Sequence, residues 1–366
     1  MSALQKYLLK SKTVANASDL PPTFAMPAPM ARKSAADYEP LPWQNYFDSS
    51  NDLNIANTND AFRVYQTRGS NSSNNSPLFY FHHGGGHSGL TWALAVKELK
   101  KGLLGESCST LCFDCRGHGA TRAENESDLS LSRLSNDCVN VINAAYPELP
   151  KEIVLVGHSM GGAVVVDVAS RGLIKNVIGV VVLDIVEGTA MESLNYVLKS
   201  LLDRPPSFPS IQKAIEWSLK HGGSKNMEAA RISIPSQIRP SQYSDDGKVT
   251  LYSWRTDLTA SEPYWTGWYD GMSSRFLAVK GGRLIILAGT DRLDKTLMIG
   301  QMQGKFQMVV LNEVGHSIQE DAPTHLARQL EIFYDRNKMN VGIKRFVIPL
   351  NPAATGSGHQ HEHTTE

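Results

Sequence analysis

Short apolar runs alternate with amphipathic stretches along most of this chain. Several runs rich in β-branched and aromatic residues have the length and composition of strands: 62–66, 78–82, 110–114, 153–156, 177–183, 284–288 and 308–311. Apolar residues at helical spacing follow some of these runs, at 130–145, 160–170 and 322–337. The run 177–183 is continuously apolar, as expected of a strand buried on both faces of a parallel sheet. The alternation predicts an α/β fold with a mostly parallel sheet flanked by helices.

One interval breaks this rhythm. About 100 residues separate the runs 177–183 and 284–288, far more than a single crossover helix needs. Helical patterns at 191–202 and 210–219 lie within it. Aromatic residues are concentrated in the same interval, namely Trp217, Trp254, Tyr264, Trp265, Trp268 and Tyr269. We therefore expect a helical cap insert over the carboxyl edge of the sheet, with most of these aromatic residues packing the insert onto the core.

The ends of the chain have a different composition from its centre. Residues 1–40 are rich in Pro, Ala and Ser and predict a flexible N-terminal arm, whereas residues 339–366 form a low-complexity tail with a His-rich run at 359–363. The predicted core then comprises residues 41–187 and 283–338, interrupted by the cap insert 188–282.

Charge and cysteine content limit the possible partners and location. The 366 residues contain 36 Lys and Arg and 36 Asp and Glu, so no overall field favours nucleic acid or an anionic membrane. No window approaches the ~18 apolar residues of a membrane span, and the first residues do not resemble a secretory signal. All four cysteines fall between Cys108 and Cys138, and we expect reduced thiols in an intracellular protein, cytoplasmic or nuclear.

The sequence GHSMG at 157–161 carries the strongest chemical signal. It follows the apolar run 153–156 and opens a predicted helix, which is the setting of a nucleophilic serine in the α/β-hydrolase fold. The turn must be sharp to expose the hydroxyl of Ser159, and its flanking glycines avoid side-chain clashes. In that fold the runs 177–183 and 284–288 are the sixth and seventh strands.

A serine needs a base, and the base needs an orienting acid. His316 follows the last predicted strand and has the chain order expected of the general base. The acid is ambiguous from the spacing. Asp291 follows the next-to-last strand, as in the general pattern of the fold, whereas Asp184 follows the run 177–183 at the same edge of the sheet.

The sequence HHGGGH at 82–87 predicts an oxyanion hole. It follows the strand 78–82, where a glycine-rich loop donates a backbone N–H to the developing negative charge. We expect the two donors to be the N–H groups of Gly85 and Met160. A zinc site at the three histidines lacks a second ligand cluster, and a phosphate-binding loop lacks the Gly-Lys-Ser/Thr ending. Acyl transfer without a metal or cofactor is therefore favoured.

Several stretches between about residue 40 and residue 337 go beyond the general pattern of the fold. The broader ones are PWQNYF (42–47), GGGHSGLTW (84–92), FDCRGHG (113–119) and VGHSMGGA (156–163). The more specific ones are LDIVEGTAM (183–191), DRLDK (291–295) and IGQMQGKFQM (299–308). In these stretches the chain resembles the protein phosphatase methylesterase family. The segment 241–247 is short, whereas family members can carry acidic inserts in this region.

The resemblance implies a substrate, a partner and an acid. The family removes the C-terminal leucine methyl ester from the catalytic subunit of type 2A serine/threonine phosphatase and releases methanol, without a cofactor. The partner is then the methylated tail of that subunit, and the acid of the triad is Asp184 rather than Asp291. Two alternatives stay open: a general small-molecule esterase of the same fold, and a scaffold that chiefly binds and inhibits the phosphatase.

Overall fold

The fold is built on an eight-stranded sheet. The computed structural model describes residues 35–70, 76–289 and 293–338 of the chain. The strand order is β1-β2-β4-β3-β5-β6-β10-β11. The strands are β1 (Ser49–Asn54), β2 (Ala61–Thr67), β3 (Leu78–His82), β4 (Ser109–Phe113), β5 (Ile153–His158), β6 (Val177–Leu183), β10 (Gly282–Ala288) and β11 (Gln307–Leu311). The strands from β4 to β11 in this order are parallel, whereas β1 and β2 pair antiparallel at one edge. The predicted mostly parallel sheet is confirmed.

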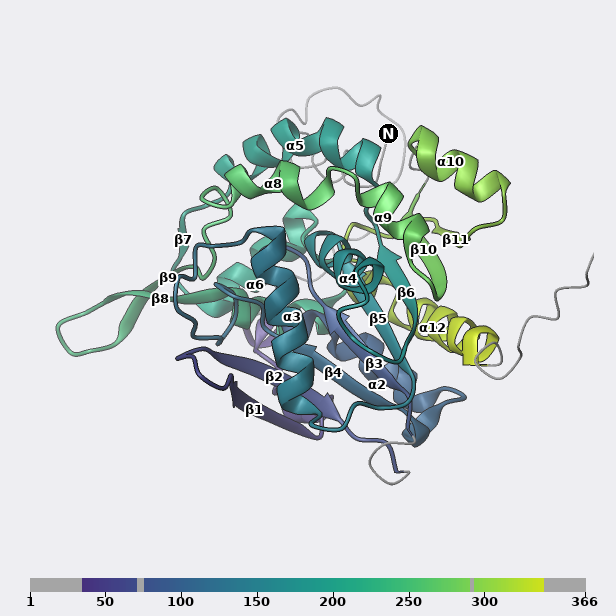
Figure 1. Cartoon of the computed structure of the whole chain (residues 1–366). Helices are drawn as coiled ribbons and strands as arrows, with labels where there is room; N and C mark the ends of the chain where they lie inside the picture. Colours follow the sequence, from purple (N-terminus) through teal and green to yellow (C-terminus); the bar gives the residue numbers. More distant parts are fainter. Residues whose placement is uncertain (1–34, 71–75, 290–292, 339–366) are drawn as a thin grey trace, which may run out of the picture.

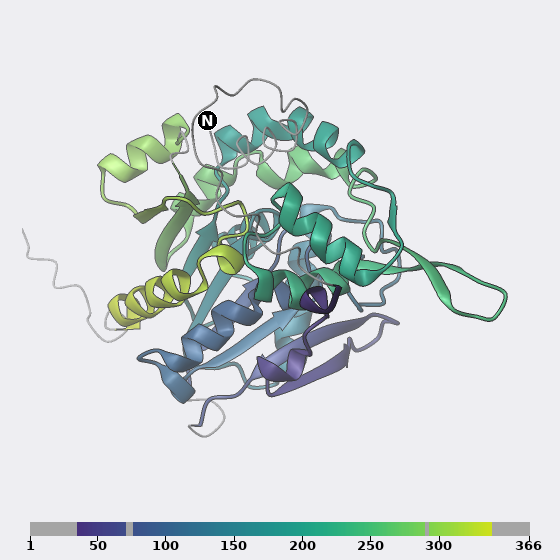
Figure 2. The same ribbon diagram turned by 180° about the vertical axis from the view of Figure 1, so that it is seen from behind.

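Helices cover both faces of the sheet. Helices α2 (Ala93–Lys101) and α12 (Pro323–Lys338) lie on one face and contact each other, whereas α3 (Leu131–Ala145) and α4 (Met160–Ser170) lie on the other (Figures 1 and 2). The burial of β5 follows from this arrangement. Ile153 and Leu155 join the hydrophobic cluster beneath α3 and α4, and the alternating Val154 and Val156 join the cluster beneath α2 and α12. A strand buried on both faces needs an apolar residue at every position, which explains the continuous apolar runs.

The long interval between β6 and β10 forms five helices and a small sheet. The helices are α5 (Glu187–Leu202), α6 (Ile211–His221), α7 (Met227–Ser233), α8 (Glu262–Tyr269) and α9 (Met272–Ala278). The small sheet has the order β7-β9-β8, with β7 (Ser207–Phe208), β8 (Ile238–Tyr243) and β9 (Val249–Trp254). Its β8–β9 hairpin projects from the body of the molecule, at the left of Figure 1. The insert is therefore mainly helical, and its sheet is an addition that the sequence pattern did not predict.

Aromatic residues of the insert fasten it to the core. Trp265 and Trp268 on α8 are 5% and 4% exposed and belong to the cluster beneath α3 and α4. The indole N–H of Trp268 donates to the carbonyl of Leu129 at 2.6 Å, so the buried indole keeps a hydrogen-bond partner. Trp217 and Trp254 instead pack with Phe208 around the small sheet. The insert thus has one part that shares the main core and one part with a core of its own.

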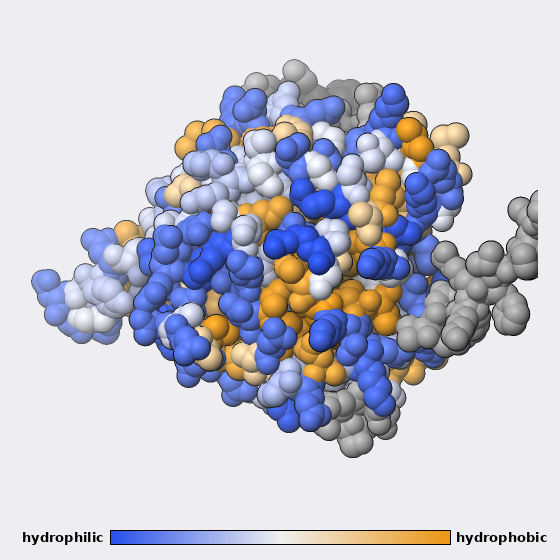
Figure 3. Space-filling view, in the orientation of Figure 1, coloured by the Kyte–Doolittle hydropathy of each residue, from blue (hydrophilic) through white to orange (hydrophobic). Residues whose placement is uncertain are grey.

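The surface carries both polar and apolar areas. Figure 3 shows a mainly hydrophilic face with apolar residues gathered near its centre. Helix α10 (Lys295–Met302) exposes Met298, Ile299 and Met302. None of the helices in the described ranges is long and apolar enough to cross a membrane.

Some sequence expectations fall outside the described residues. These are the first 34 residues of the predicted N-terminal arm, the tail 339–366 with its His-rich run at 359–363, and Asp291. The four cysteines lie within the described ranges, and all are buried and free of disulfides.

Candidate active site

Ser159 lies in the turn that joins β5 to α4. Its backbone has φ 51° and ψ −120°, a conformation that residues other than glycine rarely adopt. The Ser159 N–H donates to the carbonyl of Leu183 at 3.1 Å, which ties the turn to the neighbouring strand β6. A strained backbone conformation of this kind persists only where the surrounding structure holds it in place. In Ser159 this conformation directs the hydroxyl into a cavity at the carboxyl edge of the sheet.

Close backbone approach explains the glycines on both sides of Ser159. A Cβ atom at Gly157 would lie 2.3 Å from the carbonyl oxygen of Gly161. A Cβ atom at Gly161 would lie 2.3 Å from the carbonyl oxygen of His82 at the end of β3. Both distances are far below van der Waals contact, so a larger residue at either position would displace the turn. The G-x-S-x-G spacing is therefore a packing requirement of this turn.

Asp184 and His316 form a hydrogen-bonded pair. Asp184 follows β6, also with a positive φ of 51°, and His316 lies in the loop after β11. Oδ2 of Asp184 lies 2.7 Å from Nδ1 of His316, and its other oxygen accepts from the Ala288 N–H at 2.7 Å. Because a carboxylate only accepts, Nδ1 of His316 carries the hydrogen and Nε2 is left as an acceptor. This is the tautomer that a general base needs.

His158 supports the loop that carries His316. Its Nε2 donates to the backbone carbonyl of His316 at 2.9 Å, and the two ring centroids are 4.6 Å apart. Burial, together with the neighbouring His316 and His87, lowers the pKa of His158 well below its usual range. His158 is therefore a neutral structural partner, and it does not compete for the role of base.

Three more histidines are structural as well. Burial lowers the pKa of His82 and of His118 to about 4, and it lowers the pKa of His83 well below the usual range. Nε2 of His83 accepts from the Cys115 N–H at 2.9 Å, and Nε2 of His118 accepts from the Gly86 N–H at 2.9 Å. The neutral rings of His83 and His118 thus connect the glycine-rich loop to the loop after β4.

The two candidate oxyanion donors border the same cavity as Ser159. Met160 is the first residue of α4, where a backbone N–H has no acceptor within the helix. Gly85 lies one residue before Gly86, whose N–H is fixed by His118. Leu258 of the insert packs over this loop, because a Cβ atom at Gly85 would lie 3.3 Å from it. Both backbone segments are thus held in place beside the serine.

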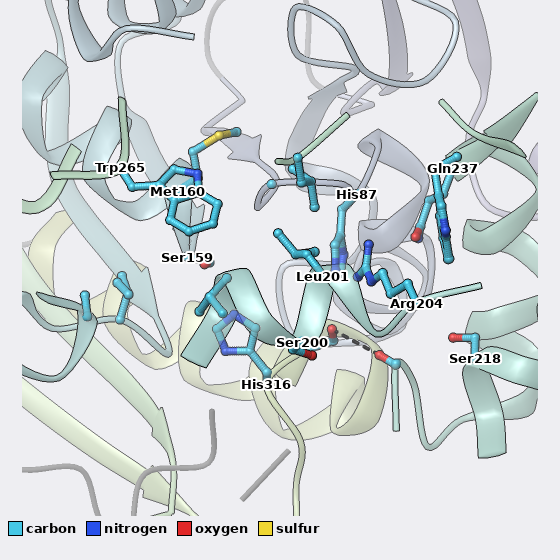
Figure 4. A pocket seen from close by; sticks show the side chains of 18 of the residues that line it. His87, Ser159, Met160, Ser200, Leu201, Arg204, Ser218, Gln237, Trp265 and His316 are labelled. Atoms are coloured by element: carbon cyan, nitrogen blue, oxygen red, sulfur yellow. Dashed lines mark hydrogen bonds between the residues drawn. The ribbon is translucent and has the colours of Figure 1, made fainter. Parts of the chain in front are cut away.

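The cavity brings Ser159 and His316 together. Its volume is about 150 Å³, and it lies between the carboxyl edge of the sheet and the insert (Figure 4). Its apolar walls come mainly from the insert, through Ala190, Leu194, Val197, Leu201, Trp217, Trp254, Leu258, Trp265, Trp268 and Tyr269. Ser159 and His316 share this space without a direct hydrogen bond between them in the described structure. Burial raises the pKa of the Tyr269 phenol to about 12, so this group stays protonated beside Ser159.

A buried polar network beneath the site was not predicted from the sequence. The Thr91 hydroxyl donates to Oε1 of Glu320 at 2.7 Å and accepts from Gln319 at 3.1 Å, and it lies 3.1 Å from Nδ1 of His87. Gln319 also lies 3.4 Å from Nδ1 of His158, which connects the network to the support of the catalytic loop. Neither Gln319 nor Glu320 belongs to a recognisable motif. The only sequence signal for a role of these residues at the site is their position three and four residues after His316.

Comparisons with known proteins show the family to which the chain belongs. The family model for the alpha/beta hydrolase family matches residues 79–329. Human protein phosphatase methylesterase 1 is 38% identical over 340 residues, covering 82% of this chain and 86% of the human protein. The probable protein phosphatase methylesterase 1 of Caenorhabditis elegans is 42% identical over 322 residues, covering 87% of this chain and 84% of the relative. The chain belongs to the protein phosphatase methylesterase family. It is therefore a carboxylic ester hydrolase with an α/β-hydrolase fold.

Solved structures support the fold of this methylesterase family member. The E-2-(acetamidomethylene)succinate hydrolase superposes with a TM-score of 0.61 at 19% identity, covering 78% of this chain and 99% of that one. An esterase of M. tuberculosis superposes with a TM-score of 0.58 at 18% identity, covering 78% and 92%. Within the described residues, no group of three or more His, Cys, Asp or Glu side chains is arranged to hold a metal ion.

Proposed function

We propose that the chain hydrolyses the C-terminal leucine methyl ester of the type 2A protein phosphatase catalytic subunit and releases methanol. The chemistry is supported by the Asp184–His316 pair at 2.7 Å beside a cavity that also exposes Ser159. The substrate is supported by relatives named protein phosphatase methylesterase 1, which match most of the chain at 38% and 42% identity. The partner in this proposal is the methylated tail of the phosphatase subunit.

In the first half-reaction Ser159 attacks the ester. Its Oγ adds to the carbonyl carbon while Nε2 of His316 takes the hydroxyl proton. Asp184 holds the imidazole in the required tautomer and stabilises the imidazolium that forms. The N–H groups of Gly85 and Met160 are the proposed donors to the tetrahedral oxyanion. Collapse breaks the C–O bond to the methoxy group, which leaves as methanol with the proton from His316.

In the second half-reaction water releases the acyl group. His316 takes a proton from the water, whose oxygen adds to the acyl carbon, and the second tetrahedral intermediate again has its charge on the Gly85 and Met160 donors. When this intermediate collapses, the bond to Ser159 Oγ breaks and His316 returns the proton to the serine. The products are a free leucine carboxylate and regenerated enzyme. None of these steps consumes a cofactor or requires a metal ion.

Specificity must come from the acyl side of the ester. A methyl group offers almost no binding surface, so it cannot distinguish one ester from another. The insert supplies most of the apolar wall of the cavity, through α5, α6 and α8. We therefore assign the insert 188–282 to substrate docking, with the N-terminal arm 1–40 as a second contact. An intracellular location, cytoplasmic or nuclear, follows from such a substrate.

The test is methanol release from carboxymethylated phosphatase, with an aryl acetate as a simple comparison ester. Wild type, Ser159→Ala and a control Ser170→Ala would be assayed side by side. Ser170 lies at the far end of α4, where its hydroxyl donates to the Asp167 carbonyl at 3.1 Å. We expect demethylation by wild type and by the control, none by Ser159→Ala, and feeble hydrolysis of the acetate.

The other outcomes separate the alternatives. Brisk serine-dependent hydrolysis of the acetate with an untouched phosphatase would indicate a general small-molecule esterase. Tight phosphatase binding by Ser159→Ala, with little turnover by wild type, would instead favour an inhibitory scaffold.

A further inference from the structure

Arg204 places a guanidinium in the cavity that holds Ser159. It lies just beyond the end of α5, where its backbone N–H donates to the Leu201 carbonyl at 3.2 Å. The guanidinium carbon lies 4.7 Å from the centre of the Trp254 ring. Figure 4 shows Arg204 beside His87, with its head group directed into the cavity.

This guanidinium has no carboxylate partner in the described part of the chain. Other arginines around the insert are engaged by oxygen atoms: Arg255 by the carboxylate of Glu126, and Arg275 by the carbonyl of Asp270. The Arg204 guanidinium instead stacks on the Trp254 ring. Stacking engages the face of a guanidinium and leaves the N–H donors at its edge available.

Among the described residues that border the cavity, no carboxylate pairs with Arg204. Burial lowers the pKa of His87 to about 3, and the positive charge of Arg204 contributes to this shift, so His87 is neutral. Glu320 borders the cavity, but Thr91 hydrogen-bonds its carboxyl group, and burial raises its pKa to about 7. Arg204 is partly exposed, and its permanent charge thus lies at the wall of a mostly aromatic and aliphatic cavity, where its N–H donors are available to a ligand.

We propose that Arg204 is a specificity residue that binds the carboxylate side chain of an acidic residue upstream of the esterified C-terminus. This inference rests on the proposed function. The reacting end of the substrate is uncharged because the methyl ester removes the terminal carboxylate. An anion that satisfies Arg204 must therefore come from another part of the acyl chain, and an Asp or Glu side chain matches the guanidinium fork with two parallel hydrogen bonds.

The test uses acetylated hexapeptide methyl esters that end in leucine. One Asp is moved through the positions upstream of the leucine, and each peptide is paired with the same peptide carrying Asn. For wild type we expect one position at which Asp lowers KM about tenfold relative to Asn, with little change in kcat. In Arg204→Gln the ratio of KM for the Asn peptide to KM for the Asp peptide should fall to about 1.

A matched control removes the same charge elsewhere on the insert. Arg239 on β8 is exposed, lies on the projecting hairpin and does not border the cavity. Arg239→Gln should keep the full Asp preference, which distinguishes a contact in the cavity from general attraction of an acidic peptide. Arg204→Lys keeps the charge but loses the fork, and we expect it to keep only part of the preference.

A binding measurement separates this inference from the proposed function. In the Ser159→Ala background the same peptide esters are not consumed, so their Kd can be measured by calorimetry with and without Arg204→Gln. The role of Arg204 would be overturned if Arg204→Gln left the ratio between the Asp and Asn peptides unchanged, both in KM and in Kd. Failure of wild type to hydrolyse any peptide ester would instead count against the proposed function and leave the binding result to decide on Arg204.

Discussion

The stability of this enzyme should depend on pH through Glu320. Its carboxyl group is buried, with the residue 2% exposed, and it accepts a hydrogen bond from Thr91 at 2.7 Å. Burial raises the pKa of Glu320 from 4.5 to about 7, although the hydrogen bond from Thr91 favours the charged form. The native state therefore holds a proton that the unfolded chain releases more easily.

The sign and size of the effect follow from linkage. Between pH 4.5 and about pH 7 the native state binds more protons than the unfolded state, so the free energy of unfolding falls as pH rises. At 1.36 kcal/mol per pH unit this interval corresponds to a loss of about 3 kcal/mol, complete above about pH 8. Glu320→Gln keeps the shape and the acceptor for Thr91 but cannot ionise. Between pH 5 and pH 8.5 the free energy of unfolding of Glu320→Gln should therefore rise relative to that of wild type by about 2–3 kcal/mol.

The assay is urea unfolding of wild type and Glu320→Gln at several pH values in this range. Buried neutral histidines such as His82 and His118, with pKa values of about 4, give the opposite slope at low pH. They are present in both proteins, so their contribution cancels in the difference between the two unfolding free energies. A difference that stays constant from pH 5 to pH 8.5 would show that the native state holds no extra proton at Glu320.

Two further predictions concern the site and its support. Asp184→Asn should lower kcat for methanol release by about 10³–10⁴-fold in a protein that melts normally. The Ala288 N–H would bind the new amide oxygen, so the amide NH₂ would face His316 and donate to its Nδ1. The hydrogen of the imidazole would then be on Nε2, which could no longer accept the proton of Ser159. An unchanged kcat would contradict this argument. Gly161→Ala should destabilise the fold in a thermal melt, because its Cβ would lie 2.3 Å from a backbone oxygen of β3. Gly267→Ala on α8, with nothing within 4 Å, should raise stability by about 0.5–1 kcal/mol, and equal effects of the two changes would contradict the packing argument.

The core of the fold was predictable because its strands are buried on both faces. The runs 78–82 and 177–183 coincide with β3 and β6. A parallel strand between two layers of helices is buried on both faces, so nearly all its residues are apolar and the strand is easily recognised in the sequence. The edge strand β1 has the sequence SSNDLN and a half-exposed burial pattern, so its register comes from pairing with β2 rather than from hydrophobicity. The small sheet of the insert escaped prediction for the same reason, because β8 is exposed at nearly every position.

The candidate site was predictable only where a motif or chain order carried it. Ser159 and His316 follow from the G-x-S-x-G turn and from the position after the last strand. The spacing left Asp184 and Asp291 open as acids, and only the family resemblance favoured Asp184. In the structure, Oδ2 of Asp184 lies 2.7 Å from Nδ1 of His316. Arg204 could not be found from the sequence, because its significance depends on which carboxylates lie nearby in space and no local pattern reports that.

The central claim is that Ser159 is the nucleophile for a C-terminal methyl ester. Its most direct test is to treat the protein with a fluorophosphonate, which phosphonylates activated serines, and to locate the adduct by mass spectrometry of the digested protein. A leucine-ending peptide methyl ester and the corresponding free acid would be added as competitors. We expect one adduct, on Ser159, whose formation the methyl ester slows more strongly than the free acid does. An adduct on another residue, no adduct in a folded protein, or equal protection by both peptides would contradict the account.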